Sequence, residues 1–159
     1  MVNSPAAPRH ELLSGRGVAF LASQVGAQSS RLWRQRLGAA GLDPRTVMVF
    51  WNVASAEGRS QRELAEALRL PASRIVNLVD GLEAQGWLVR RTRAGDRRAH
   101  ALFLTDQGRQ LLDRIMAVAA AHEEQFTSGL EPRERAALAK LLSKLASTQG
   151  LVERVHPDF

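Results

Sequence analysis

Apolar residues recur at helical spacing near the start of the chain and predict one long helix over residues 14–39. The positions that fall near one face of it are Val18, Leu21, Val25, Leu32 and Leu37. Such a helix is long for a domain of this size and indicates packing beyond its own subunit. Gly41 is expected to stop it. Residues 1–11, which include Pro5 and Pro8, are interpreted as a flexible arm.

The next apolar run predicts a helix that is buried on all sides. Asp43 followed by Pro44 is the pair of residues expected at the N-cap and in the first turn of a helix. From Val47 to Ala54 nearly every residue is apolar, which is typical of a helix inside a core. Gly58 is expected to end this helix.

Two helices joined by a very short connection come next. Ser60 and Glu63 have the spacing of a capping box, which predicts the start of a short helix. Its inward positions are expected to be Leu64, Ala65 and Leu68. Residues 69–71 break the chain before helical spacing resumes. The buried stripe of this second helix is predicted to be Ile75, Leu78, Val79 and Leu82.

The opposite face of the second helix carries small polar and basic side chains. Ser73 and Asn77 point away from the buried stripe, with Arg74 and Val76 on the flanks. Two helices of this kind match the helix-turn-helix arrangement, whose second helix enters a DNA major groove. An ordinary helical hairpin with a solvated face is the alternative.

A basic hairpin is predicted directly after this helix pair. Residues 88–92 and 99–104 have the composition of short strands, and in the second of these His100, Leu102 and Leu104 alternate with Ala101 and Phe103. Residues 90–98 hold five arginines against a single acid, Asp96. Arginine binds phosphates bidentately and can enter a narrow minor groove, so the hairpin indicates a polyanionic partner. A merely solvated turn is the alternative.

The chain ends in two more predicted helices. Thr105 and Asp106 are expected to cap a long helix, and Glu131 with Pro132 to open the last one, which Gly150 ends. The last helix carries a stripe of coiled-coil width formed by Leu138, Leu141, Leu142 and Leu145. The long helices have more apolar surface than a small centre can bury, which favours a homodimer. Pairing within one chain is the alternative.

The predicted fold is mainly α: a winged helix-turn-helix with long N- and C-terminal dimerisation helices and a small two- or three-stranded antiparallel wing. Residues 12–42 and 106–149 would form the dimerisation region and residues 43–105 the DNA-binding region. Residues 150–159 are expected to be a tail.

Composition agrees with a binding protein that has an anionic partner. The chain has 159 residues, a net charge of +6 and no cysteine. No apolar run is long enough to span a bilayer, and the first ten residues lack the apolar core of a signal peptide. We therefore expect a cytoplasmic protein that does not bind membranes. No arrangement typical of a catalytic site, a phosphate loop or a metal site is present, so no enzyme activity, cofactor or metal is expected.

Five residues at the exit of the hairpin match a known signature. Asp96, Arg98, Leu104, Thr105 and Gly108 stand at the spacing of the wing signature of the MarR (multiple antibiotic resistance regulator) transcription factors, which this chain resembles. Residues 78–90 are similar to the family's segment from recognition helix to strand. The resemblance covers about residues 12–148.

The resemblance implies roles for individual residues. Arg98 looks like the wing residue that enters the minor groove, Asp96 like the acid that orders the wing, and Arg93 and Arg97 like phosphate contacts. Ser73, Arg74, Val76 and Asn77 stand where the family approaches bases or phosphates. The family often has threonine at position 74 and a basic residue at position 77, where this chain has Arg74 and Asn77. The DNA sequence that this chain recognises therefore cannot be inferred from the family.

The resemblance also implies a mechanism. Members of the family usually repress by occupying a promoter, here a pseudo-palindrome in double-stranded DNA, and leave it when a small aromatic or anionic molecule binds between the dimer helices and the winged region. The candidate pocket residues are Trp33, Phe50, Trp51, Asn52 and His122. Core packing is the alternative for the tryptophans and the histidine. The competing function is a sequence-indifferent architectural DNA-binding protein without a ligand switch.

Overall fold

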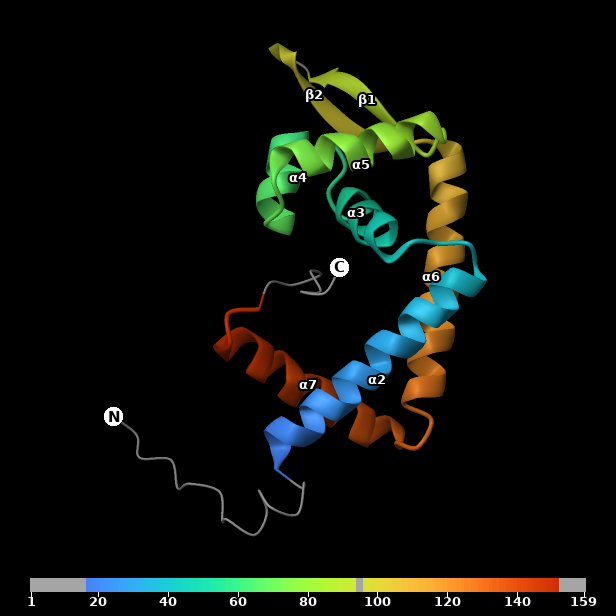
Figure 1. Ribbon diagram of the computed structural model, residues 1–159, viewed down its shortest axis with the longest axis vertical. Coiled ribbons are helices and arrows are strands. Elements are labelled where there is room, and N and C mark those ends of the chain that lie inside the picture. The colour runs from blue at the N-terminus through green and yellow to red at the C-terminus, as the bar shows by residue number, and fades with distance from the viewer. Residues whose placement is uncertain (1–16, 94–95, 152–159) are drawn as a thin grey trace, which may run out of the picture.

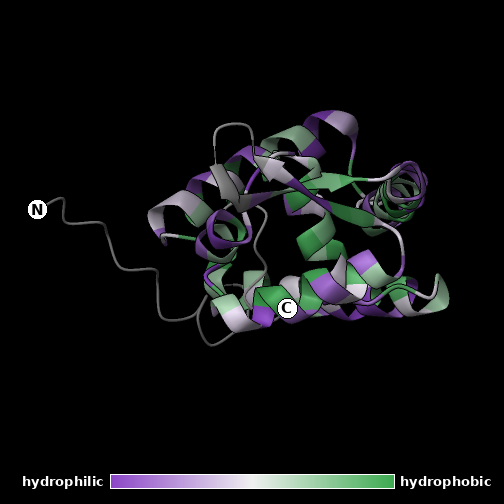
Figure 2. Ribbon diagram, turned by 90° about the horizontal axis from the view of Figure 1, so that it is seen from above, coloured by the Kyte–Doolittle hydropathy of each residue, from purple (hydrophilic) through white to green (hydrophobic). Residues whose placement is uncertain are grey.

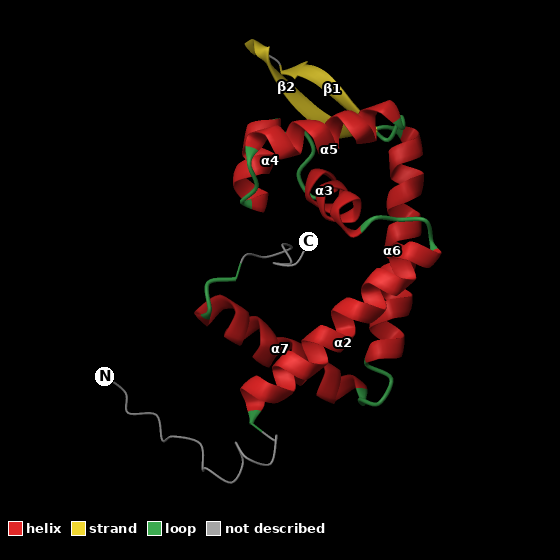
Figure 3. Cartoon of the chain, in the orientation of Figure 1, coloured by secondary structure: helices red, strands yellow, loops and turns green. Residues whose placement is uncertain are grey.

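The computed structural model describes residues 17–93 and 96–151. Most of the described chain is helical, and the strands are confined to one hairpin (Figure 3). In chain order the elements are α2 (Val18–Ala39), α3 (Pro44–Ala54), α4 (Gln61–Leu68), α5 (Ala72–Ala84), β1 (Leu88–Arg93), β2 (Asp96–Leu104), α6 (Asp106–Phe126) and α7 (Pro132–Thr148). The mainly α fold with a small antiparallel wing is confirmed.

Helix α6 connects two parts of the molecule (Figure 1). One end of α6 lies beside α3 and the root of the hairpin, with the end of α5 nearby, and α4 lies on the far side of α3 and α5. Its other end lies toward α2 and α7, which overlap in this view on the side of the molecule away from the hairpin. The parts expected to bind DNA and to dimerise are thus spatially separate and share α6 as their link.

The buried core lies in the part that carries the hairpin. Its largest fully buried side chains include Phe50 on α3, Leu64 on α4, Ile75 on α5 and Ile115 on α6. Leu37, at the C-terminal end of α2, is also buried there. The core therefore holds α5 in place from behind and leaves its opposite face exposed.

Most helices begin at the capping residues that the sequence predicts. The Asp43 side chain accepts a hydrogen bond from the backbone N–H of Thr46 at 2.9 Å, and α3 begins at Pro44. Ser60 and Glu63 form the predicted capping box of α4. The Thr105 hydroxyl accepts from the N–H of Gly108 at 3.0 Å and caps α6.

Helix α3 ends earlier than predicted, and the hairpin is longer. The helix stops at Ala54, because Gly58 belongs to a turn: it has a φ of 89° and donates its N–H to the carbonyl of Leu102 at 2.9 Å. The strands continue to Arg93 and from Asp96, with an irregularity in register after Thr92. The turn at Gly58 depends on a hydrogen bond to a residue distant in sequence, whereas the longer strands depend on pairing across the tip of the hairpin, between Arg93 and Asp96.

Residues 57–60 run beside β2 like a short third strand. Ser60 forms a bridge with Ala101, and the N–H of Leu102 donates to the carbonyl of Arg59 at 2.9 Å. Ala101 is therefore buried, although strict alternation along β2 would leave it on the face opposite the buried Leu102. The hairpin itself is a two-stranded sheet.

The apolar residues of α2 and α7 remain on the surface of the single chain. Val18 is 71% exposed on α2 and Leu141 60% on α7. No residue of α7 is buried. Figure 2 shows hydrophobic and hydrophilic residues mixed along the helices. The exposed apolar residues of α2 and α7 show that the described part of the chain does not cover the apolar side of these two helices.

Candidate nucleic-acid interface

A tight turn sets α5 at an angle to α4. Arg69 takes up a left-handed conformation with φ 51° and ends α4. The N–H of Leu70 then donates to the carbonyl of Ala65 at 3.0 Å, and α5 begins directly after Pro71. The result is the short helix-turn-helix connection that the sequence predicts.

The outer face of α5 presents the four predicted contact residues together. Ser73, Arg74, Val76 and Asn77 are all exposed, while Ile75, Val79 and Leu82 on the other side are buried. The Arg74 side chain makes no ion pair with a described residue. Its guanidinium is therefore free to meet an anionic partner.

The hairpin stands next to α5 (Figure 1). Arg93 pairs with Asp96 in the strand register. The side chains of Arg93, Asp96, Arg97 and Arg98 lie outside the described residues. At the root of the hairpin, the guanidinium of Arg91 lies 5.2 Å from the centre of the Phe103 ring, a cation–π contact that keeps this arginine on the sheet.

Arg90 links the hairpin to α5. Its guanidinium donates to the carboxylates of Asp80 and Glu83, and its backbone N–H donates to Glu83 at 3.0 Å. Burial lowers the pKa of Arg90, but the hydrogen bonds and charges of the two acids outweigh this effect and leave its pKa raised. Arg90 is therefore permanently charged and committed to an intramolecular network.

A second group of predicted residues meets where α2, α3 and α6 approach one another. The rings of Trp33 and Trp51 are stacked with centroids 6.3 Å apart. The ring of His122 lies 5.4 Å from Trp33 and 5.7 Å from Phe126. Phe50 lies apart from this aromatic cluster, because it packs edge-on against Trp87 at 6.5 Å.

His122 sits in the aromatic cluster with one ring nitrogen unused. Its Nε2 lies 3.2 Å from the Ser29 hydroxyl, and its buried Nδ1 has no hydrogen-bond partner among the residues that the structure describes. Burial lowers the pKa of His122, and the charge of Arg36 adds to this while Glu123 opposes it. The neutral ring is therefore favoured, with a nitrogen able to bind a polar group.

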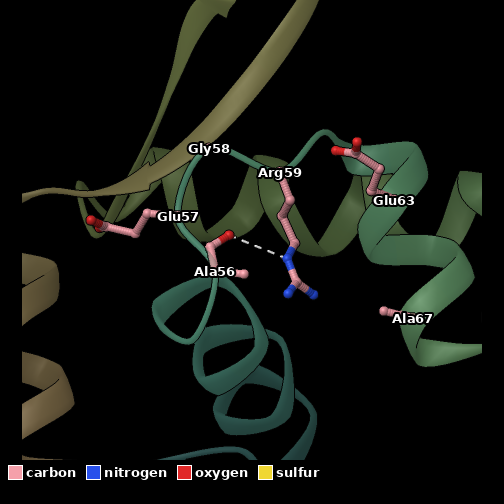
Figure 4. Close-up of a pocket in the computed structure, with 6 residues that line it drawn as sticks. All are labelled: Ala56, Glu57, Gly58, Arg59, Glu63 and Ala67. Carbon is pink, nitrogen blue, oxygen red and sulfur yellow. Dashed lines mark hydrogen bonds between the residues drawn. The ribbon is translucent and has the colours of Figure 1, made fainter.

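A separate hollow of about 400 Å³ lies between the end of α3 and the start of α4. Figure 4 shows its lining, in which the Arg59 side chain donates to the carbonyl of Ala56 at 3.2 Å. Glu63 is used in the capping box, and Glu57 accepts from the N–H of Leu104 at 2.8 Å. The charged groups of this hollow thus have structural roles, and it contains none of the predicted site residues.

The described residues contain no group of three or more histidine, cysteine, aspartate or glutamate side chains that could hold a metal ion. Among the described helices, none combines the length and the apolar character needed to cross a membrane.

Comparison with known proteins points to the MarR family. A model described as MarR family matches residues 40–99. A putative transcriptional regulatory protein for the hcr operon of Thauera aromatica is 35% identical over 105 residues, which are 66% of this chain and 63% of that protein. Residues 40–99 thus match the MarR family, and the chain is similar to a transcriptional regulatory protein beyond that segment. It spans slightly less than two thirds of the length of this relative.

Solved structures of MarR-family members share the fold. The transcriptional repressor CouR, bound to a 23-mer DNA duplex, is 28% identical with a TM-score of 0.71, over 88% of this chain and 98% of CouR. A MarR-family regulator from Rhodococcus sp. RHA1 is 28% identical with a TM-score of 0.66, over 90% of this chain and 95% of that one.

The side chains that contact His122 and Arg90 were not predicted from the sequence. Ser29 and Phe126 beside His122 were not predicted as neighbours, because 93 positions separate Ser29 from His122. The link from Arg90 to Asp80 and Glu83 was also missed. The spacing of the two acids on one helix face was the available signal.

Proposed function

We propose that this MarR-family protein is a homodimeric transcriptional repressor that binds a pseudo-palindromic operator in double-stranded DNA. The observation that carries the proposal is the exposed polar and basic face of α5, set beside a hairpin rich in arginine. CouR, with a similar fold, was solved on a DNA duplex. A chromosomal operator also implies action in the cytoplasm.

Each predicted contact residue has a role in this proposal. Ser73, Arg74, Val76 and Asn77 approach base edges or phosphates in the major groove. Arg93 and Arg97 contact phosphates, and Arg98, on a wing ordered by Asp96, enters the minor groove of the DNA. Residues 43–105 form the DNA-binding region, and residues 12–42 and 106–149 the dimerisation region. Two recognition helices about 34 Å apart would read an inverted repeat.

The apolar faces of α2 and α7 support the dimer. Phe20 is 52% exposed and Leu145 44%, and isolated domains rarely leave so many large apolar side chains uncovered. A second copy of the chain would bury them across a symmetric interface.

Arg74→Ala tests the proposed contact face. On a duplex selected from a random pool, the variant should bind about 5- to 150-fold more weakly, the effect of 1–3 kcal/mol for one good groove contact. Fluorescence anisotropy measures this affinity. The matched control is Arg133→Ala on α7. Arg133 pairs with Glu131, and this variant should bind the duplex with unchanged affinity. Equal affinity of Arg74→Ala and wild type would remove this face of α5 from the interface.

We also propose that a small aromatic or anionic effector binds at the aromatic cluster and releases DNA. Trp33, Trp51 and His122 connect α2, α3 and α6, so a molecule inserted there would alter how the DNA-binding region sits on the dimer helices. The effector acts only as far as it prefers the geometry that does not fit DNA.

Phenolic acids provide the test of the effector site. A compound that lowers operator affinity should also change tryptophan fluorescence, and His122→Phe should abolish both effects by removing the polar ring nitrogens. A compound that releases DNA equally well from wild type and from His122→Phe would place the effector elsewhere.

A further inference from the structure

The C-terminal half of α5 carries negative charge where it is least expected. Asp80 and Glu83 lie one turn apart on a helix that ends at Ala84. They repel each other, they lie near the negative end of the helix dipole, and the proposed partner of this helix is a polyanion. A cation close to both carboxylates would offset all three effects.

Arg90 provides this compensation from the first strand of the hairpin. Its fork-shaped guanidinium reaches both carboxylates at once, and its backbone N–H adds a third bond, to Glu83. The Arg90 side chain is only 19% exposed. Two carboxylates on one bidentate arginine form a stiff connection between α5 and β1.

The connection lies where a small change in the angle between α5 and the hairpin would move the hairpin tip by a larger distance. Arg90 lies near the root of the hairpin, where Trp87 has just left α5 with its N–H bonded to the carbonyl of Leu82. A strand advances about 3.3 Å per residue, so a small tilt at Arg90 becomes a larger displacement at Arg93 and beyond. The angle between α5 and the hairpin therefore depends on the three bonds made by Arg90.

We infer that Arg90, Asp80 and Glu83 form a positioning network that sets the hairpin against α5 for simultaneous contact with two grooves, so that the two acids strengthen sequence-specific DNA binding despite their charge. The inference rests on the proposed DNA-binding function. It assigns Arg90 no contact with DNA.

The decisive variant is Asp80→Asn combined with Glu83→Gln, which removes two negative charges and keeps Arg90. Affinities for the selected duplex and for a scrambled duplex are compared at one salt concentration. The network predicts that the scrambled duplex binds as tightly as before or more tightly. The selected duplex should bind about tenfold more weakly, comparable to the loss of one groove contact. The ratio of the two affinities falls.

Either of two other results for the Asp80→Asn, Glu83→Gln variant would overturn the inference. If the acids act only through their charge, both duplexes bind more tightly and the ratio stays constant. If they merely hold Arg90 away from DNA, the freed arginine steepens the salt dependence by about 0.9 in the log–log slope and the selected duplex binds more tightly.

The control is Glu66→Gln on α4. Glu66 is an exposed acid paired with Arg62, and its removal should leave the affinity ratio unchanged. Arg90→Gln should also lower the ratio, and the triple variant should lose no more than Arg90→Gln does, because all three residues belong to one unit. If circular dichroism shows that Arg90→Gln does not fold, the affinity ratio of the Asp80→Asn, Glu83→Gln variant still tests the inference. A wild-type protein without any preference between duplexes would instead refute the proposed function.

Discussion

Replacing Leu141 and Leu145 with aspartate is expected to make the protein monomeric and to weaken operator binding by about 10²- to 10⁴-fold. Both side chains are exposed on α7, at 60% and 44%, and in the proposed dimer they are buried against a second copy. A buried, unpaired carboxylate is strongly unfavourable. The DNA-contacting residues are unchanged, so the loss of affinity measures the loss of the second half-site contact.

Light scattering gives the oligomeric state, and anisotropy on the selected duplex gives the affinity. The matched control places the same two charges on the opposite side of α7, as Ala136→Asp with Ser147→Asp. Both positions are exposed, and this variant should remain dimeric. A Leu141→Asp, Leu145→Asp protein that is still a dimer would exclude the α7 stripe from the interface.

Replacing Gly108 with alanine is expected to destabilise the fold by about 3 kcal/mol. A Cβ at this position in α6 would overlap the carbonyl oxygen of Trp87 and lie 3.4 Å from the Phe50 ring. The Trp87 carbonyl also accepts from the N–H of Thr105 at 3.1 Å, so it cannot move away without breaking that bond. Chemical denaturation measures the change in the free energy of unfolding.

Gly81→Ala is the control for this measurement. Gly81 lies inside α5, and a Cβ there would meet nothing within 4 Å, so the variant should be about 0.5–1 kcal/mol more stable. A Gly108→Ala protein as stable as wild type would contradict the close contact between Gly108 on α6 and the Trp87 carbonyl in the turn between α5 and β1. This contact gives a physical reason for the glycine in the wing signature.

Features defined by neighbouring residues could be predicted from the sequence. The caps at Asp43, Ser60 and Thr105, and the exposed face of α5, depend on spacing within one or two turns. The burial of Ala101 could not be predicted, because it depends on a bridge from Ser60. The early end of α3 was not predictable either, because Gly58 forms a hydrogen bond with Leu102 on β2.

Some residues of the candidate site could likewise be predicted from the sequence, and others could not. Periodicity alone brings Ser73, Arg74 and Asn77 to one surface. The cluster around His122 and the network of Arg90 require elements to pack in a particular geometry, and the residue types alone do not define it. The amphipathic faces of α2 and α7 were apparent from the sequence, but their exposure in a single chain required the structure.

We propose that this protein reads a DNA sequence as a dimer. The most direct test is the ratio of its affinities for a selected pseudo-palindrome and for a scrambled duplex of equal length, at one physiological salt concentration. A sequence-specific regulator should prefer the selected duplex by roughly 10³-fold or more. Similar affinities for both duplexes would contradict the account and support an architectural DNA-binding protein.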